Sequence, residues 1–388
     1  MANLIGARIE RKEDKKFLTG KGKYTADINL PKQTYAYFVR SPHARAKITK
    51  VDHSKAMKAP GVIDVFTGDC VAKDKIGGLI CGWKIVSQDG KDMKCPPHPV
   101  LAKDSVNFVG DHVAVVVAET LEQAKNAAEL VNVGYKIQKA VIKTEEATSF
   151  ENIHEGIDNN LSFDFLLGDK GKTDEAFSKA DKIVKLDIVN NRLIPNAMEP
   201  RAAIGDYNTS TDELTLYTAS QNPHLDRLIM SAFNAVHPEH KFRIVAPDVG
   251  GGFGSKINVY AEDVVVAYAS KKIGRPVKWV AERSESFMSD NHGRDHVTHA
   301  ELAVSNDGKM IGIKVDTIAN LGAYSLVLAA VTPTYLYAPL LLGIYDIPTA
   351  CCTVKGVYTN TAPTDAYRGA GRPEATYVIE RIVTEAAK

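Results

Sequence analysis

A run of glycines in the second half of the sequence is its most informative chemical feature. The run reads Asp248-Val249-Gly250-Gly251-Gly252-Phe253-Gly254-Ser255-Lys256. Glycine lets the backbone approach a ligand closely and turn its N–H groups toward an anion. The P-loop order Gly-Lys-Ser/Thr is missing, and Ser255 replaces the last glycine of a dinucleotide fingerprint. The run therefore favours a phosphate-bearing or oxo-bearing ligand over a kinase or nicotinamide site. A tight turn without a ligand is the simpler alternative.

Two further segments carry groups that suit the same kind of ligand. One reads Ala366-Tyr367-Arg368-Gly369-Ala370-Gly371-Arg372-Pro373, with two arginines around two glycines just before a predicted helix. Arginine makes bidentate contacts with oxyanions, and helix N-termini attract them. The other reads Ser220-Gln221-Asn222-Pro223-His224, where Gln221 could donate an amide hydrogen bond. A solvated loop and a polar turn ended by proline are the alternatives.

The elements that must position these segments follow from the apolar patterns around them. A continuous apolar run at 113–118 predicts a buried strand, and Thr120 with Gln123 predicts a capping box for the next helix. Further strands are expected at 131–135, 214–218 and 242–246. Helices are expected at 261–272, with Gly274 as its end, and at 373–388. The Asn306-Asp307-Gly308 turn predicts a hairpin between strands at 296–304 and 310–317.

Composition limits the classes of protein to consider. The chain has 388 residues, 44% apolar and 24% charged, as expected for a soluble globular protein of two or three domains. A net charge of +1 gives no electrostatic case for binding nucleic acid. No apolar run reaches the roughly 18 residues of a membrane span, and the charged start does not read as a secretory signal. We therefore expect a cytoplasmic protein.

The five cysteines and the polar stretch at 143–160 complete the organisation. No C-x-x-C pair occurs, so we expect free thiols and neither a zinc site nor an iron–sulfur cluster. The stretch is rich in Glu, Asn, Asp and Gly and lacks an apolar period, which predicts a linker. We predict an N-terminal arm at 1–16, a first domain at 17–142, the linker at 143–160 and a second domain at 161–388.

Together these segments resemble one family. The order S-Q-N-P-H, G-G-G-F-G-S-K, A-Y-R-G-A-G-R-P-E-A is similar to the molybdopterin-binding large subunit of xanthine dehydrogenases, aldehyde oxidases and carbon monoxide dehydrogenases. Residues 17–24, 40–44 and 109–112 resemble signatures of that family's hammerhead domain. The resemblance covers essentially the whole chain. It implies an α+β fold, with a hammerhead domain followed by the first molybdopterin-binding domain.

The resemblance also implies a cofactor, partners and site residues. The cofactor would be molybdenum with molybdopterin cytosine dinucleotide, and FAD and 2Fe–2S clusters would lie on partner chains. Gln221 and Arg368 would be the catalytic residues, Gln221 bonding the oxo ligand and Arg368 lying beside the metal through its backbone. The remaining cofactor-binding residues would be Gly251, Gly252, Phe253, Gly254 and Gly369. The amides of Phe253 and Gly254 would face the metal's oxygen ligands. The pterin dithiolene, not the protein, would ligate the metal.

Large subunits of the family run to about twice this length, so the second molybdopterin domain is expected on another chain. The implied function is oxidation of an aldehyde or N-heterocycle with water as oxygen source, by a chain that is inactive without that second half. The alternative is a truncated or scaffold half-subunit that binds partner chains without catalysis. A nucleotide-binding protein that uses the glycine run is a third, weaker hypothesis.

Departures from the family pattern bear on the substrate. Copper-containing carbon monoxide dehydrogenases have a cysteine where this chain has Gly369, which disfavours that activity. Xanthine-type enzymes have a glutamate in place of Ile257 and a phenylalanine in place of Ala370. We interpret Glu199 as a structural residue paired with a nearby arginine, and not as a catalytic base.

Overall fold

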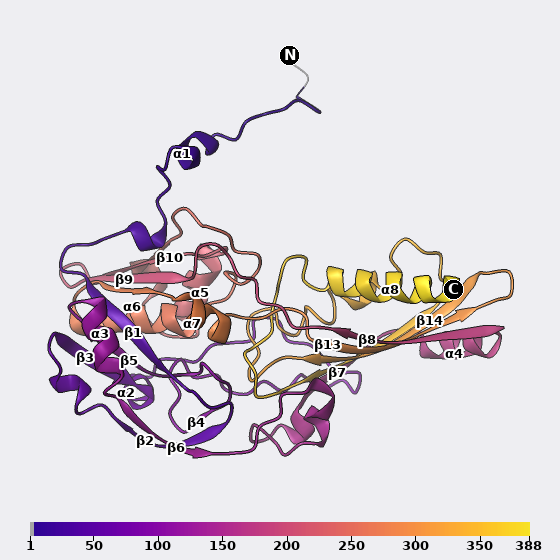
Figure 1. The fold of residues 1–388 in the computed structure, drawn as a ribbon, viewed down its shortest axis with the longest axis horizontal. Helices are drawn as coiled ribbons and strands as arrows, with labels where there is room; N and C mark the ends of the chain where they lie inside the picture. Colours follow the sequence, from indigo (N-terminus) through magenta and orange to yellow (C-terminus); the bar gives the residue numbers. More distant parts are fainter. Residues whose placement is uncertain (1–3) are drawn as a thin grey trace.

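The computed structural model describes residues 4–388; residues 1–3 of the predicted N-terminal arm lie outside the described part. Figure 1 shows two lobes side by side, each built on its own large sheet, and an N-terminal segment that extends away from the first lobe. The extended segment contains α1 (Asp14–Leu18) and is followed by the short helix η1 (Thr25–Asp27).

A seven-stranded sheet forms the centre of the first lobe. Its order is β11-β10-β9-β12-β1-β5-β3. The bounds are β1 (Thr34–Arg40), β3 (Val62–Thr67), β5 (His112–Ala118), β9 (Ala202–Asn208), β10 (Glu213–Thr218), β11 (Phe242–Val245) and β12 (Val277–Val280). Strands β1 and β12 pair in parallel through Thr34 with Val277. This pairing joins strands from both sides of the predicted linker into one sheet.

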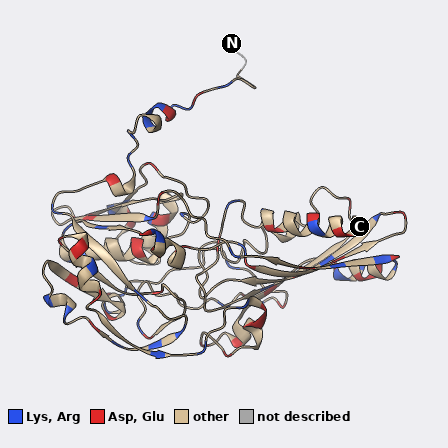
Figure 2. Ribbon diagram, viewed as in Figure 1, with Lys and Arg blue, Asp and Glu red and all other residues tan. Residues whose placement is uncertain are grey.

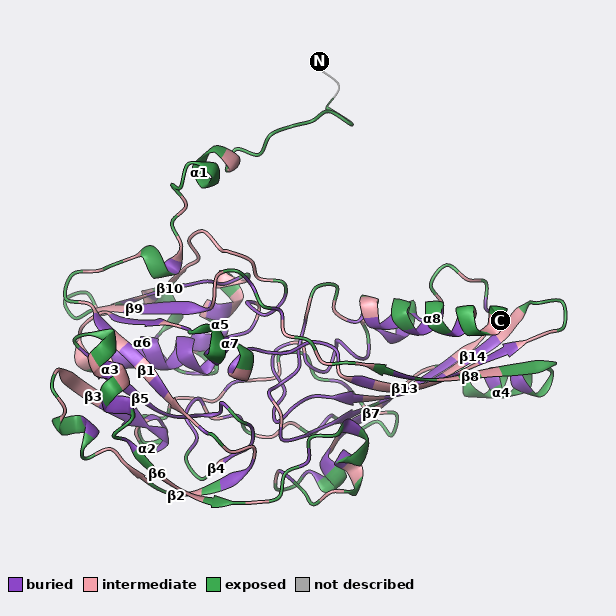
Figure 3. Cartoon of the chain, viewed as in Figure 1, coloured by how far each residue is buried: buried purple, intermediate pink, exposed green. Residues whose placement is uncertain are grey.

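Smaller elements complete this lobe. A three-stranded sheet has the order β4-β2-β6, with β2 (Ala46–Asp52), β4 (Ser105–Val106) and β6 (Asn132–Ile137). The helices are α2 (Gly68–Lys73), α3 (Leu121–Ala128), α5 (Pro223–Ala232), α6 (Ala261–Ile273) and α7 (Arg283–Ser289), with short turns η2 (Ala56–Lys58) and η5 (Glu239–Lys241). Helix α6 is buried from Ala261 to Ser270, and Figure 3 shows it in the interior of the lobe.

The second lobe is a five-stranded sheet with the order β7-β15-β14-β13-β8. Its strands are β7 (Leu161–Gly168), β8 (Lys182–Asn190), β13 (His296–Val304), β14 (Met310–Asn320) and β15 (Ala350–Val357). Helices α4 (Lys170–Ser178) and α8 (Arg372–Ala387) pack on it, and η6 (Ala338–Leu340) follows β14. The apolar face of α8, formed by Val378, Ile379 and Ile382, is buried. The sheet therefore covers the apolar face of this last helix.

The predicted α+β fold is confirmed, and several local predictions hold. Strand β5 is buried along its whole length, as its continuous apolar run indicated. The Thr120–Gln123 capping box is present. Helix α6 ends at Gly274, whose φ of 67° is left-handed. The predicted hairpin is the antiparallel pair β13–β14.

The predicted linker is packed rather than extended. Residues 143–160 form η3 (Thr144–Ser149) and η4 (Asp158–Asn160), and η3 contacts the second sheet. Asn160 is fully buried, accepts a hydrogen bond from the amide of Ile153 at 2.7 Å and donates to the carbonyl of Ala147 at 2.9 Å. An asparagine side chain here replaces backbone pairing, which apolar periodicity does not reveal. The four-part division of the chain stays a prediction.

Three further properties concern the described chain as a whole. Basic and acidic residues are interspersed over both lobes, as the colours of the ribbon in Figure 2 show. None of the helices between residues 4 and 388 combines the length and apolar character needed to cross a membrane. The five cysteines are free thiols, as predicted.

Candidate functional site

The three segments that the sequence singled out meet at one place. The amide of Gly254 donates to Oε1 of Gln221 at 2.9 Å, and the amide of Arg368 donates to the carbonyl of Phe253 at 2.8 Å. The amide of Gln221 donates in turn to the carbonyl of Lys256 at 2.8 Å. Residues 221, 253–254 and 368 are thus joined by direct hydrogen bonds, although 147 positions separate the first from the last.

Glycine is required where these segments touch. A Cβ on Gly252 would lie 2.3 Å from Oε1 of Gln221, and a Cβ on Gly254 would lie 2.3 Å from the carbonyl oxygen of Ala366. Gly251, Gly254 and Gly369 have φ values between 97° and 101°, in the region that favours glycine. The glycines therefore serve the close approach of one segment to another, beside any approach to a ligand.

Phe253 departs from the rest of the loop because it is bulky and yet has a φ of 53°. Such a conformation is unusual for an aromatic residue and is often found at functional positions. Its side chain is 42% exposed, and the guanidinium of Arg368 lies 5.7 Å from the ring centroid. In this backbone conformation the carbonyl of Phe253 accepts a hydrogen bond from the backbone amide of Arg368.

The face that results carries hydrogen-bond donors without partners. Among residues 4–388, no hydrogen bond is recorded for Nε2 of Gln221 or for the amides of Phe253 and Gly369. Since Oε1 of Gln221 accepts from Gly254, its Nε2 is left as a donor. Gln221, Phe253, Arg368 and Gly369 are all exposed, so these donors face an open surface. Clustered donors of this kind suit an anionic or oxo-bearing ligand.

Gly254 differs from its predicted role in one respect. The sequence predicted that its amide faces the oxygen ligands of a metal, but the residue is buried and its amide is already used on Gln221. A buried donor that is satisfied within the chain is better suited to fixing its acceptor than to binding a ligand. In this structure Gly254 fixes the orientation of the Gln221 amide.

Comparison with known proteins identifies the family. A family model described as "Molybdopterin cofactor-binding domain" matches residues 153–388, and one described as "Aldehyde oxidase and xanthine dehydrogenase, a/b hammerhead domain" matches residues 19–139. The chain belongs to this molybdopterin-binding family. The predicted order of a hammerhead domain followed by a molybdopterin-binding domain is confirmed.

Three relatives show how far the likeness extends. The nicotine 6-hydroxylase large subunit of Paenarthrobacter nicotinovorans is 32% identical over 100% of this chain and 47% of its own length. The nicotinate dehydrogenase large molybdopterin subunit of Eubacterium barkeri is 30% identical over 95% of this chain and 82% of its own length. The reconstituted CO dehydrogenase from Oligotropha carboxidovorans matches with a TM-score of 0.90 and 33% identity, over 98% of this chain and 48% of that chain. The chain thus spans about half the length of most of the curated relatives it matches.

A buried ion pair supports the start of the glycine loop. Nζ of Lys256 donates to Oε2 of Glu199 at 2.8 Å, and the amide of Gly250 donates to the same oxygen at 2.7 Å. Burial lowers the pKa of Lys256, while the hydrogen bond and charge of Glu199 act in the opposite direction. Glu199 was predicted to be a structural residue paired with an arginine. Its structural contacts are present, but the partner is Lys256, because the loop folds back over the carboxylate.

A larger buried charge network lies deeper in the same lobe. Glu262 on α6 accepts two hydrogen bonds from Arg201 at 2.9 Å, and one from Arg40 at 2.9 Å. Nε2 of His112 lies 2.9 Å from the same carboxylate. Burial alone would raise the pKa of Glu262, but Arg201, His112 and Arg40 together hold it well below its usual range. The network ties hammerhead strands β1 and β5 to α6, the helix that follows the glycine loop.

Sequence reasoning did not find this network, although two of its members lie in segments that carried the resemblance. Arg40 belongs to R-S-P-H-A and His112 to V-G-D-H. Those motifs therefore mark an attachment of the hammerhead domain rather than ligand contacts. For the acceptor the sequence gives only a weak signal, because Glu262 lies with Asp263 in the first turn of α6, where acidic residues are common whether or not they are buried.

Tyr260 and Asn291 connect the two ligand-facing loops from behind. The hydroxyl of Tyr260 lies 2.7 Å from the carbonyl oxygen of Ser255 and 2.6 Å from Oδ1 of Asn291. Nδ2 of Asn291 donates to the carbonyl of Ala366 at 3.2 Å. The glycine loop and the segment before Arg368 are therefore held to the same pair of buried side chains.

Proposed function

We propose that this chain supplies one wall of a molybdenum–molybdopterin site in a hydroxylase that oxidises an aldehyde or N-heterocycle, with water as the oxygen source. The observation that carries the proposal is that hydrogen bonds through the buried Gly254 and the Phe253 carbonyl join the exposed residues Gln221, Phe253 and Arg368 into one face with unpartnered donors. The family match supports the choice of ligand.

The residues present fit such a cofactor. Its oxygens are acceptors, and Nε2 of Gln221 with the amides of Phe253 and Gly369 supplies donors from three segments of the chain. The absence of a Cβ on Gly252 lets Gln221 lie directly against the glycine loop, which brings these segments together. When bound, the cofactor supplies redox chemistry that no side chain of this chain can supply. Gln221 would polarise an oxygen of the bound cofactor, and Gly254 would hold Gln221 in place. The backbone of Arg368 is bonded to Phe253 and Arg294, so it would contribute by holding the neighbouring Gly369 amide at this face.

We propose that residues outside this chain complete the site. Most curated relatives are about twice as long, whereas the nicotinate dehydrogenase subunit is covered over 82% of its length. The exposed Phe253 and the 90% exposed Met198 leave apolar surface at this face for another polypeptide. That polypeptide would carry the second molybdopterin domain, and further chains would carry the 2Fe–2S clusters and FAD. The cytosine dinucleotide form of the pterin is proposed by analogy with bacterial members.

Three positions in the arginine and glycine loops bear on the class of substrate. Gly369 cannot supply the thiolate that a copper site needs, and Ile257 and Ala370 supply neither a carboxylate nor an aromatic ring for purine recognition. The name of one relative refers to nicotine, an N-heterocycle. An aldehyde or N-heterocycle therefore fits better than carbon monoxide or xanthine.

The test is metal and pterin analysis of the chain co-purified with the polypeptides encoded beside it. The proposal predicts molybdenum and pterin in the complex and neither in the chain purified alone. A stable complex without molybdenum would instead support the scaffold alternative, in which the chain binds partners without catalysis.

A further inference from the structure

Arg294 is a buried side chain that holds the arginine loop from behind. It lies between α7 and β13, and its side chain is only 7% exposed. Nη1 donates to the carbonyl of Tyr367 at 3.0 Å and Nη2 to the carbonyl of Arg368 at 3.0 Å. Nη1 also pairs with Oε1 of Glu374 at 3.0 Å, in the first turn of α8. One guanidinium group therefore fixes two consecutive peptide carbonyls.

The direction of those carbonyls determines where the next amides point. No peptide bond in the described part of the chain is cis, so each C=O and the following N–H point in opposite directions. The Tyr367 carbonyl faces Arg294, and the Arg368 amide accordingly faces away and reaches Phe253 at 2.8 Å. By the same geometry the Arg368 carbonyl faces Arg294 and the Gly369 amide faces away, toward the exposed side of the loop.

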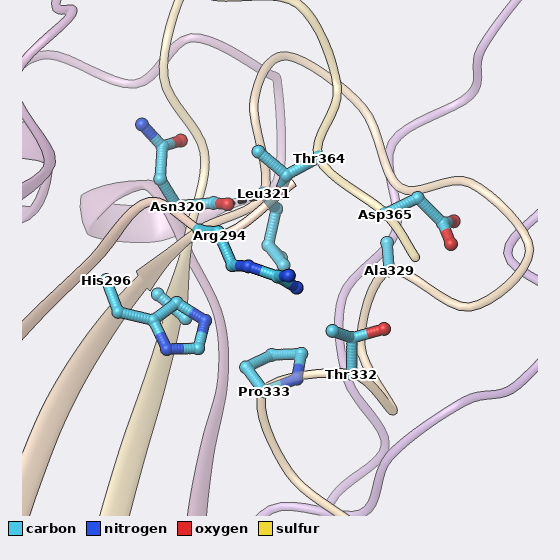
Figure 4. A pocket seen from close by; sticks show the side chains of 10 residues that line it. Arg294, His296, Asn320, Leu321, Ala329, Thr332, Pro333, Thr364 and Asp365 are labelled. Atoms are coloured by element: carbon cyan, nitrogen blue, oxygen red, sulfur yellow. Dashed lines mark hydrogen bonds between the residues drawn. The ribbon is translucent and has the colours of Figure 1, made fainter. Parts of the chain in front are cut away.

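Arg294 also borders a small cavity that is lined by both polar and apolar residues. The cavity has a volume of about 10 Å³, room for about one water molecule. Figure 4 shows Arg294 extending into it, with His296, Thr332 and Asp365 around. The guanidinium thus has polar groups near it, and its planar fork is the group that suits two adjacent acceptors. A lysine could keep the charge pair with Glu374 but has no such fork.

We propose that Arg294 is a positioning residue that orients the Gly369 amide as a donor to the bound molybdenum cofactor. The identity of the ligand in this inference rests on the proposed function. The effect of Arg294 on the conformation of the loop does not. The Arg294 contacts exist in the chain itself, so their effect on the loop can be measured whether or not a cofactor binds.

The test compares Arg294→Lys with a matched control, Arg192→Lys. Like Arg294, Arg192 pairs with a carboxylate, that of Asp295, and donates to a backbone carbonyl, that of Ala362. It does not contact residues 366–372. Hydrogen exchange of the full chain would report the order of segment 367–372. Molybdenum retained by the co-purified complex after dialysis would report cofactor binding.

We expect Arg294→Lys to speed exchange in segment 367–372 and to lower retained molybdenum about tenfold, the lower end of the effect of removing an orienting neighbour of a metal site. Arg192→Lys should change neither. Unchanged exchange in the segment would overturn the inference, and so would faster exchange with wild-type molybdenum retention. A wild-type complex that binds no molybdenum would overturn the proposed function, while the exchange result would still decide whether Arg294 orders the loop.

If Arg294→Lys speeds hydrogen exchange throughout the chain, a second variant tests the inference instead. The double variant Arg294→Gln with Glu374→Gln removes both buried charges together, so neither is left unpaired. It should again show faster exchange confined to segment 367–372, together with reduced molybdenum. Wild-type exchange in that segment would contradict the assignment.

Discussion

The proposed ligand-binding surface and the layer beneath it are built from different kinds of interaction. The surface consists of backbone groups and one amide side chain, on residues that are mostly exposed. The layer beneath consists of buried ions, with Arg201 and Arg40 on Glu262, Lys256 on Glu199 and Arg294 on Glu374. The two layers therefore have different roles. Backbone donors carry little charge and can approach a ligand closely, and the buried charged side chains hold these donors in their orientation.

The comparison predicts that the deep layer has the largest effect on stability. Glu262→Gln should lower the free energy of unfolding by about 3 kcal/mol, the lower end for a broken buried pair, because Arg201 and Arg40 lose the carboxylate they share and keep only Asp290 and Glu285 as counter-charges. Denaturant unfolding of the chain measures this. The exposed pair of Lys179 and Glu175 provides the control, since Lys179→Gln should have no measurable effect. A loss below about 1 kcal/mol for Glu262→Gln would remove the distinction between the layers.

At the surface, the largest expected effect is on cofactor binding. Gly254→Val should abolish molybdenum retention in the assembled complex, because its Cβ would collide with the carbonyl of Ala366 and its φ is 101°. Gly308→Val is a matched control, with a φ of 82° in the hairpin turn and no atom within 4 Å of its Cβ. It should keep wild-type molybdenum. Full molybdenum occupancy in Gly254→Val would show that the loop does not form the site.

A smaller and more selective effect is expected for the side chain that faces the ligand. Gln221→Ala should lower turnover per bound molybdenum about 100-fold, the typical loss when one stabilising donor is removed, while most of the molybdenum stays bound. Steady-state kinetics normalised to metal content measures it. Gln88→Ala, at an exposed position in the hammerhead half, should behave as wild type. Unchanged kinetics in Gln221→Ala would refute a direct role for this amide.

The smallest expected effect is on how stability depends on pH, and it tests whether Asp226 supports the segment that carries Gln221. Burial raises the pKa of Asp226 to about 8, and its carboxylate accepts a hydrogen bond from Ser220, next to Gln221. A raised pKa means that the folded chain binds this proton more tightly than the unfolded chain. Stability from this group is therefore present below about pH 4, near the ordinary value of 3.8, and is lost as pH rises toward 8.

Asp226→Asn should consequently lose less stability than wild type between pH 5 and pH 7 in urea unfolding. Asp307→Asn serves as a control, because its carboxylate is exposed and its pKa is lowered instead of raised. Parallel stability curves for wild type and Asp226→Asn across this interval would count against a buried, protonated Asp226.

The sequence predicted the meeting of the three loops, but not what holds them. The glycine run, Gln221 and the Arg368 segment could be found because each is a local pattern with unusual residue types. Helix α6 could be placed because Gly274 and the apolar run define its end and interior. These are short-range features that one chain segment contains by itself.

The support layer could not be found in this way because its pairs are long-range. Arg294 and Glu374 are 80 residues apart, and Arg40 and Glu262 are 222 apart. A lone charged residue in sequence does not show whether it is buried, and the partner of Glu199 was wrongly expected to be an arginine. The packing of residues 143–160 was missed for a related reason, since Asn160 there satisfies backbone groups that a strand or helix would otherwise pair.

The most direct test of the central claim is to locate molybdenum in crystals of the assembled complex by its anomalous scattering. The account predicts one metal in front of Gln221, with an oxygen ligand within about 3 Å of Nε2 and the Gly369 amide facing the same cofactor. Molybdenum bound elsewhere, with these donors facing only solvent or protein, would contradict it.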